Sequence, residues 1–209
     1  MPIGTTVRRL LGPLETKAID LYRGYFIDLE ELVRDIASFG DFDRVLEIGA
    51  GDGLVCALMR DAMPKAEILG IDIDGATGRM VSDHERIEFR QVSTGELLTE
   101  AHPPFDLVII VDVLHHVPVA DRPALIRDAV DLLAPGGLLV VKDWERDDGL
   151  HHRVTYFADR YISGDRTVAF MTRDELLDVV YGNAGSLSKV AEFRVPPRAN
   201  NLFLALRRG

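Results

Sequence analysis

Three glycines at alternating positions are the residues of this sequence best suited to building a ligand site. Gly49, Gly51 and Gly53 follow the mostly apolar run 45–48 and precede a helical pattern. Without a Cβ, glycine lets the backbone turn sharply and approach a ligand, and the N-terminus of the following helix offers free N–H groups. The pattern indicates a ligand-binding loop. A tight turn with no ligand is the alternative.

A carboxylate stands at the end of the next apolar run. Asp72 closes the segment 67–72, and α/β nucleotide sites place an acceptor for the ribose hydroxyls at the end of this strand. A helix N-cap or a solvated strand end is the other interpretation of an aspartate here, and Asp74 suits that role better. We therefore expect Asp72 to bind a sugar.

The glycine spacing distinguishes between nucleotide cofactors. The dinucleotide fingerprint G-x-G-x-x-G requires a glycine where this chain has Leu54, which disfavours NAD and FAD. Glu47, Gly49, Gly51 and Gly53 instead match the signature E/D-x-G-x-G-x-G, and on these residues the sequence resembles the class I S-adenosylmethionine-dependent methyltransferases. Further matches to that family lie at 70–72, 105–108 and 133–138.

The resemblance implies a binding site for S-adenosyl-L-methionine. Its residues would be Glu47, Gly49, Ala50, Gly51, Gly53, Asp72, Ile73, Ser93, Thr94, Asp112 and Val113. The loop 49–53 would pack against the methionine part, Asp72 would take the ribose hydroxyls, and Ile73 would cover one adenine face. Ser93 stands where many relatives have an aspartate near the adenine amino group, so this chain departs from the family there. Asp112 also follows from position, because it ends the fourth predicted strand with a carboxylate suited to an ammonium group.

Histidines are the candidate bases for such a site. Methyl transfer from a sulfonium mainly requires alignment in a dry pocket, but a base helps when the acceptor is a hydroxyl or an amine. His115 and His116 lie in a segment resembling the Leu-His-His-Val of ubiquinone- and menaquinone-type methyltransferases, and His151 and His152 follow the fifth predicted strand. The alternatives are a structural role for the first pair and a solvated loop for the second.

Two carboxylates are candidate metal ligands. Asp112 and Asp143 stand where catechol-type relatives hold magnesium, but the next residue is Trp144, where that arrangement needs an oxygen ligand. We therefore expect no metal.

The surrounding pattern predicts the elements that position these residues. Near-continuous apolar runs are typical of parallel strands buried on both faces. The expected strands cover 44–48, 67–72, 86–91, 105–111 and 137–142, and the expected helices cover 53–62, 75–82, 120–133 and 172–182. Thr172 and Glu175 form a capping-box signature for the last helix. Segments 188–195 and 202–206, joined by a short connection, should pair antiparallel.

These elements predict an α/β fold of the Rossmann-like, doubly wound kind. Its mostly parallel seven-stranded sheet would carry an antiparallel C-terminal strand and an N-terminal helical cap. Residues 14–39 have apolar positions at helical spacing. We expect a single domain, 1–209, divided into a cap over 1–42 and a cofactor-binding core over 43–209.

Composition limits the partners of this domain. The chain has 209 residues, 34 acidic against 24 basic, and a formal charge of -10, which argues against nucleic acid as a partner. The single cysteine, Cys56, lies in an apolar run and excludes an internal disulfide framework, which fits a reducing cytoplasm. We expect neither an export signal nor membrane insertion. These features are compatible with a homodimer as well as with a monomer.

The acceptor is expected to be a small molecule. Aromatic residues at helical spacing are more often core than ligand contacts, yet together they favour an apolar or aromatic acceptor. They are Tyr22, Tyr25, Phe26, Trp144, Tyr156, Phe157 and Tyr161. The leading interpretation is O-, C- or N-methylation of such a compound in secondary metabolism. The alternatives are a protein that uses the fold for another reaction or for binding, and an NAD-dependent oxidoreductase.

Overall fold

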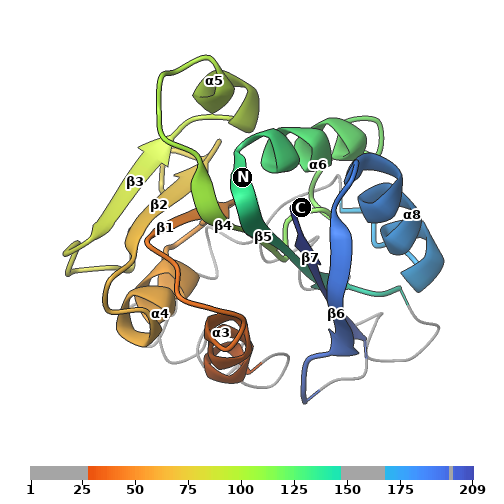
Figure 1. Ribbon diagram of the computed structural model, residues 1–209, viewed down its shortest axis with the longest axis horizontal. Coiled ribbons are helices and arrows are strands. Elements are labelled where there is room, and N and C mark those ends of the chain that lie inside the picture. Colours follow the sequence, from red (N-terminus) through yellow and green to blue (C-terminus); the bar gives the residue numbers. More distant parts are fainter. Residues whose placement is uncertain (1–27, 147–167, 198–199) are drawn as a thin grey trace, which may run out of the picture.

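The computed structural model describes residues 28–146, 168–197 and 200–209. In these residues the strands form a seven-stranded sheet in the order β3-β2-β1-β4-β5-β7-β6 (Figure 1). The strands are β1 Arg44–Ile48, β2 Glu67–Asp72, β3 Ile87–Gln91, β4 Phe105–Val111, β5 Leu133–Trp144, β6 Ser188–Arg194 and β7 Asn201–Arg207. Strands β1 to β5 pair in parallel, and β7 is antiparallel to both β5 and β6. The predicted sheet and its antiparallel ending are confirmed.

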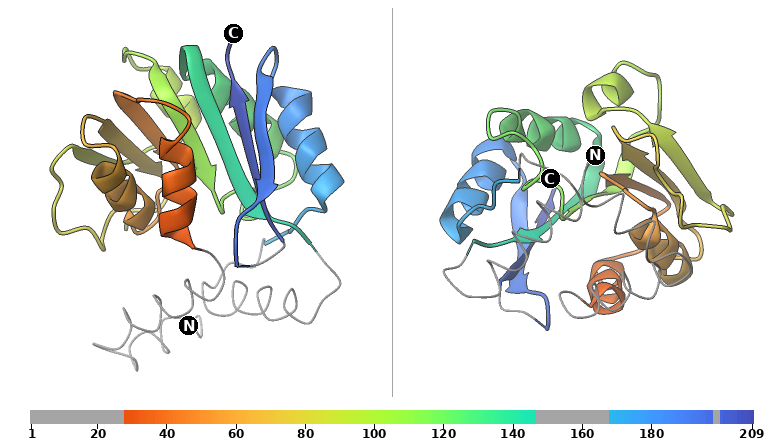
Figure 2. Two further views of the ribbon diagram at one scale, coloured as in Figure 1. Left: turned by 60° about the horizontal axis from the view of Figure 1, so that its bottom comes forward. Right: turned by 180° about the vertical axis from the view of Figure 1, so that it is seen from behind.

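Helices cover both faces of this sheet (Figures 1 and 2). They are α3 Leu29–Ala37, α4 Leu54–Ala62, α5 Thr94–Leu98, α6 Arg122–Asp131 and α8 Arg173–Asn183. Buried residues of α3 and α4 belong to one hydrophobic cluster, and those of α5, α6 and α8 belong to another. The doubly wound arrangement is therefore present.

The alternation along β4 explains why its sequence is almost wholly apolar. Leu107 and Ile109 pack into the cluster with α3 and α4, whereas Val108 and Ile110 pack into the cluster on the opposite face. Since successive side chains of a strand point to opposite faces, a strand covered on both sides must be apolar throughout. The capping box of Thr172 and Glu175 at the start of α8 is also confirmed.

The structure differs from the sequence-based expectations at three places. The segment 75–82, expected to be a helix, forms turns, because Gly78 has a left-handed φ of 73° and its N–H donates to Gly51 O. The short helix α5 was not predicted. Strand β5, expected over 137–142, begins earlier, at Leu133. Leu133 pairs with Phe105 before a bulge shifts the register.

The N-terminal cap is described only in part. Helix α3 belongs to the predicted helical stretch, while residues 1–27 lie outside the described residues. Asp28 caps this helix by accepting from Glu31 N. None of the helices in the described ranges is long and apolar enough to cross a membrane.

Candidate functional site

The predicted cofactor residues follow neighbouring parallel strands. Ile48, at the end of β1, is in register with Ile71 of β2 on one side and with Ile110 of β4 on the other. The segments that leave these three strands therefore start side by side at one edge of the sheet. Ligands of open α/β sheets bind at this edge, beyond the carboxyl ends of the strands.

The glycine loop adopts a backbone shape that requires glycine. Gly49, Gly51 and Gly53 have φ angles of 76°, 52° and 90°. The N–H groups of Gly49 and Ala50 both donate to Ile71 O, at 2.8 and 2.9 Å. These bonds fix the start of the loop to the end of β2, so the loop is held before any ligand arrives.

Neighbouring side chains explain why two of the three loop positions must be glycine. A Cβ on Gly49 would lie 2.4 Å from Val113 Cγ2, and one on Gly53 would lie 2.6 Å from the Phe89 ring. Among the described residues, a Cβ on Gly51 would meet nothing closer than Gly49 O at 4.0 Å. Only Gly51 therefore leaves its side-chain position open, and Val113 packs against the loop as a neighbour.

Asp72 is bonded to the glycine loop itself. Its Oδ2 accepts from Gly51 N and its Oδ1 from Asp74 N, both at 2.9 Å. The structure thus places the carboxylate that we expect to bind ribose against the glycine loop, and the ribose contact stays a prediction. Ile73 follows with 79% of its surface exposed, so a flat ligand could cover it.

Ser93 and Thr94 use their hydroxyl groups within the protein. Ser93 is the N-cap of α5 and forms a capping box with Glu96. The Thr94 hydroxyl donates to Asp128 Oδ2 at 2.6 Å. The segment starts beside Asp72, because Val92 N donates to Asp72 O. Any adenine contact from these residues would use other atoms, and that contact stays a prediction.

Glu47 does not reach the surface of the loop. The buried Cys56 thiol on α4 donates to its Oε2 at 2.7 Å, and the Glu47 side chain is almost fully buried. Burial, together with the nearby carboxylates of Asp52 and Asp72, raises the pKa of Glu47 to about 8, although the hydrogen bond from Cys56 acts in the opposite direction. Glu47 is therefore largely uncharged at neutral pH in this structure.

Asp112 has a partner that the sequence analysis missed. The fully buried Lys142 Nζ donates to Asp112 Oδ1 at 2.6 Å and lies 4.7 Å from the centre of the Trp144 ring. Asp112 has a left-handed φ of 57°, and its N–H donates to Lys142 O. The signal in the sequence was a lysine that directly follows the apolar run 138–141.

His115 is paired with a buried carboxylate. Its Nδ1 lies 2.6 Å from Asp143 Oδ1, and its backbone N–H donates to Asp143 Oδ2 at 3.2 Å. The ring stacks on Phe170 with centroids 4.8 Å apart, and the half-buried His116 ring lies 4.1 Å away. Burial alone would raise the pKa of Asp143, but His115, the Trp144 N–H and Lys142 outweigh it and hold the pKa below its usual value. His151 and His152 lie outside the described residues.

Asp112, His115 and Asp143 form the one cluster within the described part of the chain that resembles a metal ligand set. Their ligand atoms lie within 4.8 Å of one another. The Lys142 ammonium already bonds Asp112, and Asp143 accepts from His115 and from Trp144 N. The cluster is thus a network of compensated charges, and the donor set does not fit a hard cation that needs several free oxygens.

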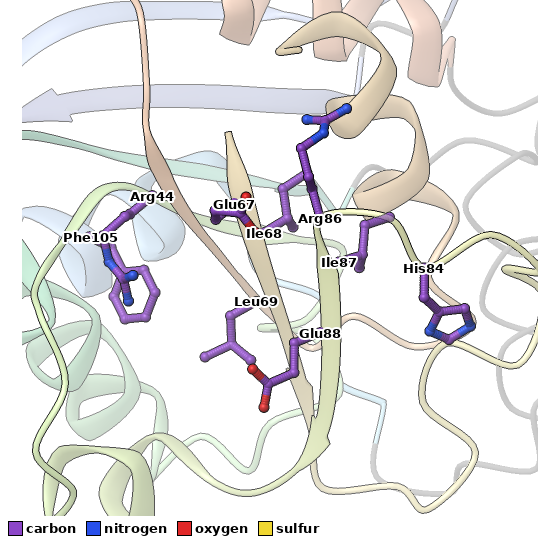
Figure 3. Close-up of a pocket in the computed structure, with 9 residues that line it drawn as sticks. All are labelled: Arg44, Glu67, Ile68, Leu69, His84, Arg86, Ile87, Glu88 and Phe105. Atoms are coloured by element: carbon purple, nitrogen blue, oxygen red, sulfur yellow. The ribbon is translucent and has the colours of Figure 1, made fainter. Parts of the chain in front are cut away.

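A shallow groove of about 370 Å³ lies at the opposite end of the strands (Figure 3). Arg44, Glu67 and Ile87, which begin β1, β2 and β3, line it together with Phe105. Arg86 points away toward α4, where its guanidinium donates to the carbonyls of Arg60, Met63 and Ala66. The groove is at the amino ends of the strands, so it is separate from the glycine loop.

Comparisons of sequence relate the chain to methyl-transferring proteins. A family model described as a methyltransferase domain matches residues 7–183. The ubiquinone biosynthesis O-methyltransferase of Maricaulis maris is 33% identical over 102 residues, covering 46% of this chain and 39% of that protein. Its counterpart in Bordetella avium is 30% identical over 112 residues, covering 51% and 45%. The aligned part thus spans less than half of these curated relatives.

Solved structures share the fold. The 1,6-didemethyltoxoflavin-N1-methyltransferase of Burkholderia thailandensis, solved with 1,6-didemethyltoxoflavin and S-adenosylhomocysteine, has a TM-score of 0.66 at 20% identity. That comparison covers 98% of this chain and 88% of the other. The N-methyltransferase NodS of Bradyrhizobium japonicum has a TM-score of 0.59 at 17% identity, covering 86% and 93%. At these low identities the structural likeness shows the fold alone, and it confirms the predicted Rossmann-like class.

Proposed function

Because the chain belongs to the methyltransferase-domain family, we propose that it transfers the methyl group of S-adenosylmethionine to a small-molecule acceptor. The family match confirms the resemblance that the glycine signature predicted. The observation that carries the proposal is the bond from Gly51 N to Asp72 Oδ2, because it joins the predicted methionine-binding loop to the predicted sugar-binding carboxylate.

The cofactor would lie across the carboxyl ends of β1, β2 and β4. Its adenine would cover the exposed Ile73, its ribose would face Asp72, and its methionine part would follow the backbone at Gly51, whose side-chain position is open. Asp112 would face the cofactor's ammonium group, with half of its carboxylate already bonded to Lys142. When bound, the cofactor supplies an electrophilic methyl carbon and a neutral leaving group.

We propose His115 as the base, oriented by Asp143. Since Nδ1 faces the carboxylate, the ring would act as a base through Nε2, and the acceptor would have to bind against a ring that is only 2% exposed in this structure. The acceptor oxygen or nitrogen would attack the methyl carbon while the carbon–sulfur bond breaks, and its proton would pass to His115. The buried carboxylate stabilises the imidazolium that results, as in other oriented histidines. His116 is the neighbouring alternative, and no metal has a part in this proposal.

The acceptor is proposed to be apolar or aromatic. Trp144, Val168 and Phe170 form a separate buried apolar cluster, and Phe170 stacks on His115, the proposed base. Planar phenolic or quinol-like compounds suit such surroundings, because aromatic rings stack favourably on one another. Two relatives are named for ubiquinone biosynthesis, which supports O-methylation, and we extend the proposal to secondary metabolism.

A turnover assay with isotopically labelled cofactor tests the proposal. The protein would be incubated with methyl-labelled S-adenosylmethionine and a panel of phenols, quinols and aromatic amines, and products followed by mass spectrometry. We expect label on one acceptor class together with an equal amount of S-adenosylhomocysteine, and loss of both with Asp72→Ala. Tight cofactor binding with no turnover across the panel would favour the binding-module alternative. Failure to bind either form of the cofactor would refute both.

A further inference from the structure

Glu47 and Cys56 form a buried polar contact beneath the glycine loop. Glu47 is the second-last residue of β1, and Cys56 is the third residue of α4, so the two residues lie on the elements that enter and leave the loop. The thiol donates to Glu47 Oε2 at 2.7 Å, and Cys56 has no exposed surface. No other described cysteine is present.

The space around this contact is closed. A Cβ on Gly70 of β2 would lie 2.9 Å from Cys56 Sγ and 2.8 Å from the Phe89 ring. The thiol therefore has little freedom to move toward β2, and the Glu47 side chain that it bonds is itself buried. A buried carboxyl group needs a hydrogen-bond partner, and Cys56 supplies it.

We propose that Glu47 is a positioning residue that fixes the direction in which α4 leaves the glycine loop, through its contact with Cys56, without touching the cofactor. The loop would then be held at both ends. Gly49 N and Ala50 N bond its start to Ile71 O of β2, and Glu47 bonds the first turn of α4 through the thiol. The inference rests on the proposed placement of the cofactor at this loop.

The charges around Glu47 agree with a role inside the protein. The groups that face it are the Cys56 thiol and the carboxylates of Asp52 and Asp72. Burial and these carboxylates raise the pKa of Glu47, and burial also raises the pKa of Cys56, so the contact joins two uncharged groups near neutral pH. An uncharged Glu47 adds no third negative charge beside the loop.

A double-mutant cycle on cofactor binding tests this inference. The affinity for S-adenosylhomocysteine would be measured by calorimetry for the wild type, Glu47→Leu, Cys56→Ala and the double variant. We expect each single change to weaken binding about tenfold, because one hydrogen bond that orders the loop is lost. The double variant should bind no more weakly than either single variant, since both changes remove the same contact.

Conservative variants and matched controls separate positioning from a general loss of stability. Glu47→Gln and Cys56→Ser keep a donor and an acceptor, and we expect both to bind within roughly twofold of the wild type. Met59→Ala, a fully buried change one turn further along α4, should lower the melting temperature and leave affinity unchanged. Glu67→Gln on the exposed start of β2 should alter neither.

Each outcome of these binding measurements either supports or overturns the positioning role of Glu47. Additive losses, or a Cys56→Ala variant that binds like the wild type while Glu47→Gln loses affinity, would overturn the inference in favour of direct contact between Glu47 and the ligand. If Glu47→Leu does not fold, the pair Cys56→Ala and Cys56→Ser still tests it, and equal affinities in these two variants would overturn it. A wild type that does not bind S-adenosylhomocysteine would refute the proposed function first.

Discussion

The Nζ atom of Lys142 lies 2.6 Å from Oδ1 of Asp112, so a fully buried ammonium is bonded to a carboxylate that still reaches solvent. The Asp112 side chain is 28% exposed, whereas that of Lys142 has no exposed surface. A charge that stays buried without its partner costs much more than one that water can hydrate. The two halves of this ion pair should therefore differ in their contribution to stability.

We predict that Asp112→Asn destabilises the protein more than Lys142→Met does. The first change removes the carboxylate to which the buried ammonium is bonded and leaves it only the charge of Asp143 nearby, at a cost of about 3 kcal/mol, whereas the second leaves a carboxylate that water can reach. Urea unfolding of the two variants measures the difference. The double variant should recover part of the loss, and equal losses in the single variants would contradict the prediction.

Removing the contact between His115 and Asp143 should lower the rate of turnover without weakening cofactor binding. Asp143→Asn replaces one of the carboxylate oxygens that accept from His115 and Trp144, so the imidazole would no longer be held in one orientation. We expect the rate of S-adenosylhomocysteine formation to fall about a hundredfold or more. Affinity for S-adenosylhomocysteine should stay near that of the wild type in calorimetry.

His115→Ala and His116→Ala are the matched pair for this measurement. If His115 is the base, its removal should match the effect of Asp143→Asn, and removal of His116 should have a much smaller effect on the rate. Full turnover by Asp143→Asn with the same acceptor would show that the pair has only a structural role.

Alanine substitutions in the glycine loop should separate effects on the stability of the protein from effects on its affinity for the cofactor. Alanine at Gly49 or Gly53 would place a Cβ within 2.4 Å of Val113 or 2.6 Å of Phe89, so both variants should lose stability by overpacking. Alanine at Gly51 meets no such neighbour in the part of the chain that the structure describes, and it should cost only about 1 to 2 kcal/mol for its left-handed backbone. Gly51→Ala should nevertheless bind the cofactor poorly, because its Cβ would occupy the proposed ligand position.

Unfolding curves and calorimetry on the three alanine variants test this directly. The expected order is a larger loss of unfolding free energy for Gly49→Ala and Gly53→Ala, and a loss of affinity for Gly51→Ala that exceeds its loss of stability. A Gly51→Ala variant that binds S-adenosylhomocysteine as tightly as the wild type would move the ligand away from the loop.

Local sequence patterns predicted the parallel strands because each of these strands is buried on both faces. The apolar run of β4, for example, has the bounds that its sequence predicted, 105–111. The turn segment 75–82 was predicted wrongly because its shape depends on the Phe89 ring, against which a Cβ on Gly78 would lie at 2.3 Å. The helical periodicity of one segment contains no information about an aromatic ring on a later strand, here Phe89 of β3.

The arrangement of the candidate site could be predicted where it depends on the spacing of residues that are close in sequence. It could not be predicted where it depends on the register between paired strands. The glycine loop and Asp72 follow from residues that are close in sequence. Lys142 and Asp112 are 30 residues apart and meet because β4 and β5 pair with Val111 opposite Lys142. His115 and Asp143, 28 residues apart, meet through the same pairing. No sequence pattern fixes that register, so neither pair was foreseen.

The buried Glu47 predicts how stability depends on pH. In the folded protein burial raises its pKa to about 8 from 4.5, so between these values the native chain holds a proton that the unfolded chain has released. Unfolding then releases a proton, and stability must fall as pH rises from about 5 to about 8, by up to about 1.4 kcal/mol per pH unit from this group. Below and above this window both states have the same protonation, and the contribution is constant.

Glu47→Gln isolates this contribution, because all other titrating groups are shared with the wild type. The unfolding free energy of the variant minus that of the wild type should rise steadily from pH 5 to pH 8 and then level off, as measured by urea unfolding across a series of buffers. Glu67→Gln, at an exposed position of β2, should run parallel to the wild type. Parallel curves for Glu47→Gln and the wild type would mean that Glu47 is ionised in the folded protein, since only a retained proton couples folding to pH in this range.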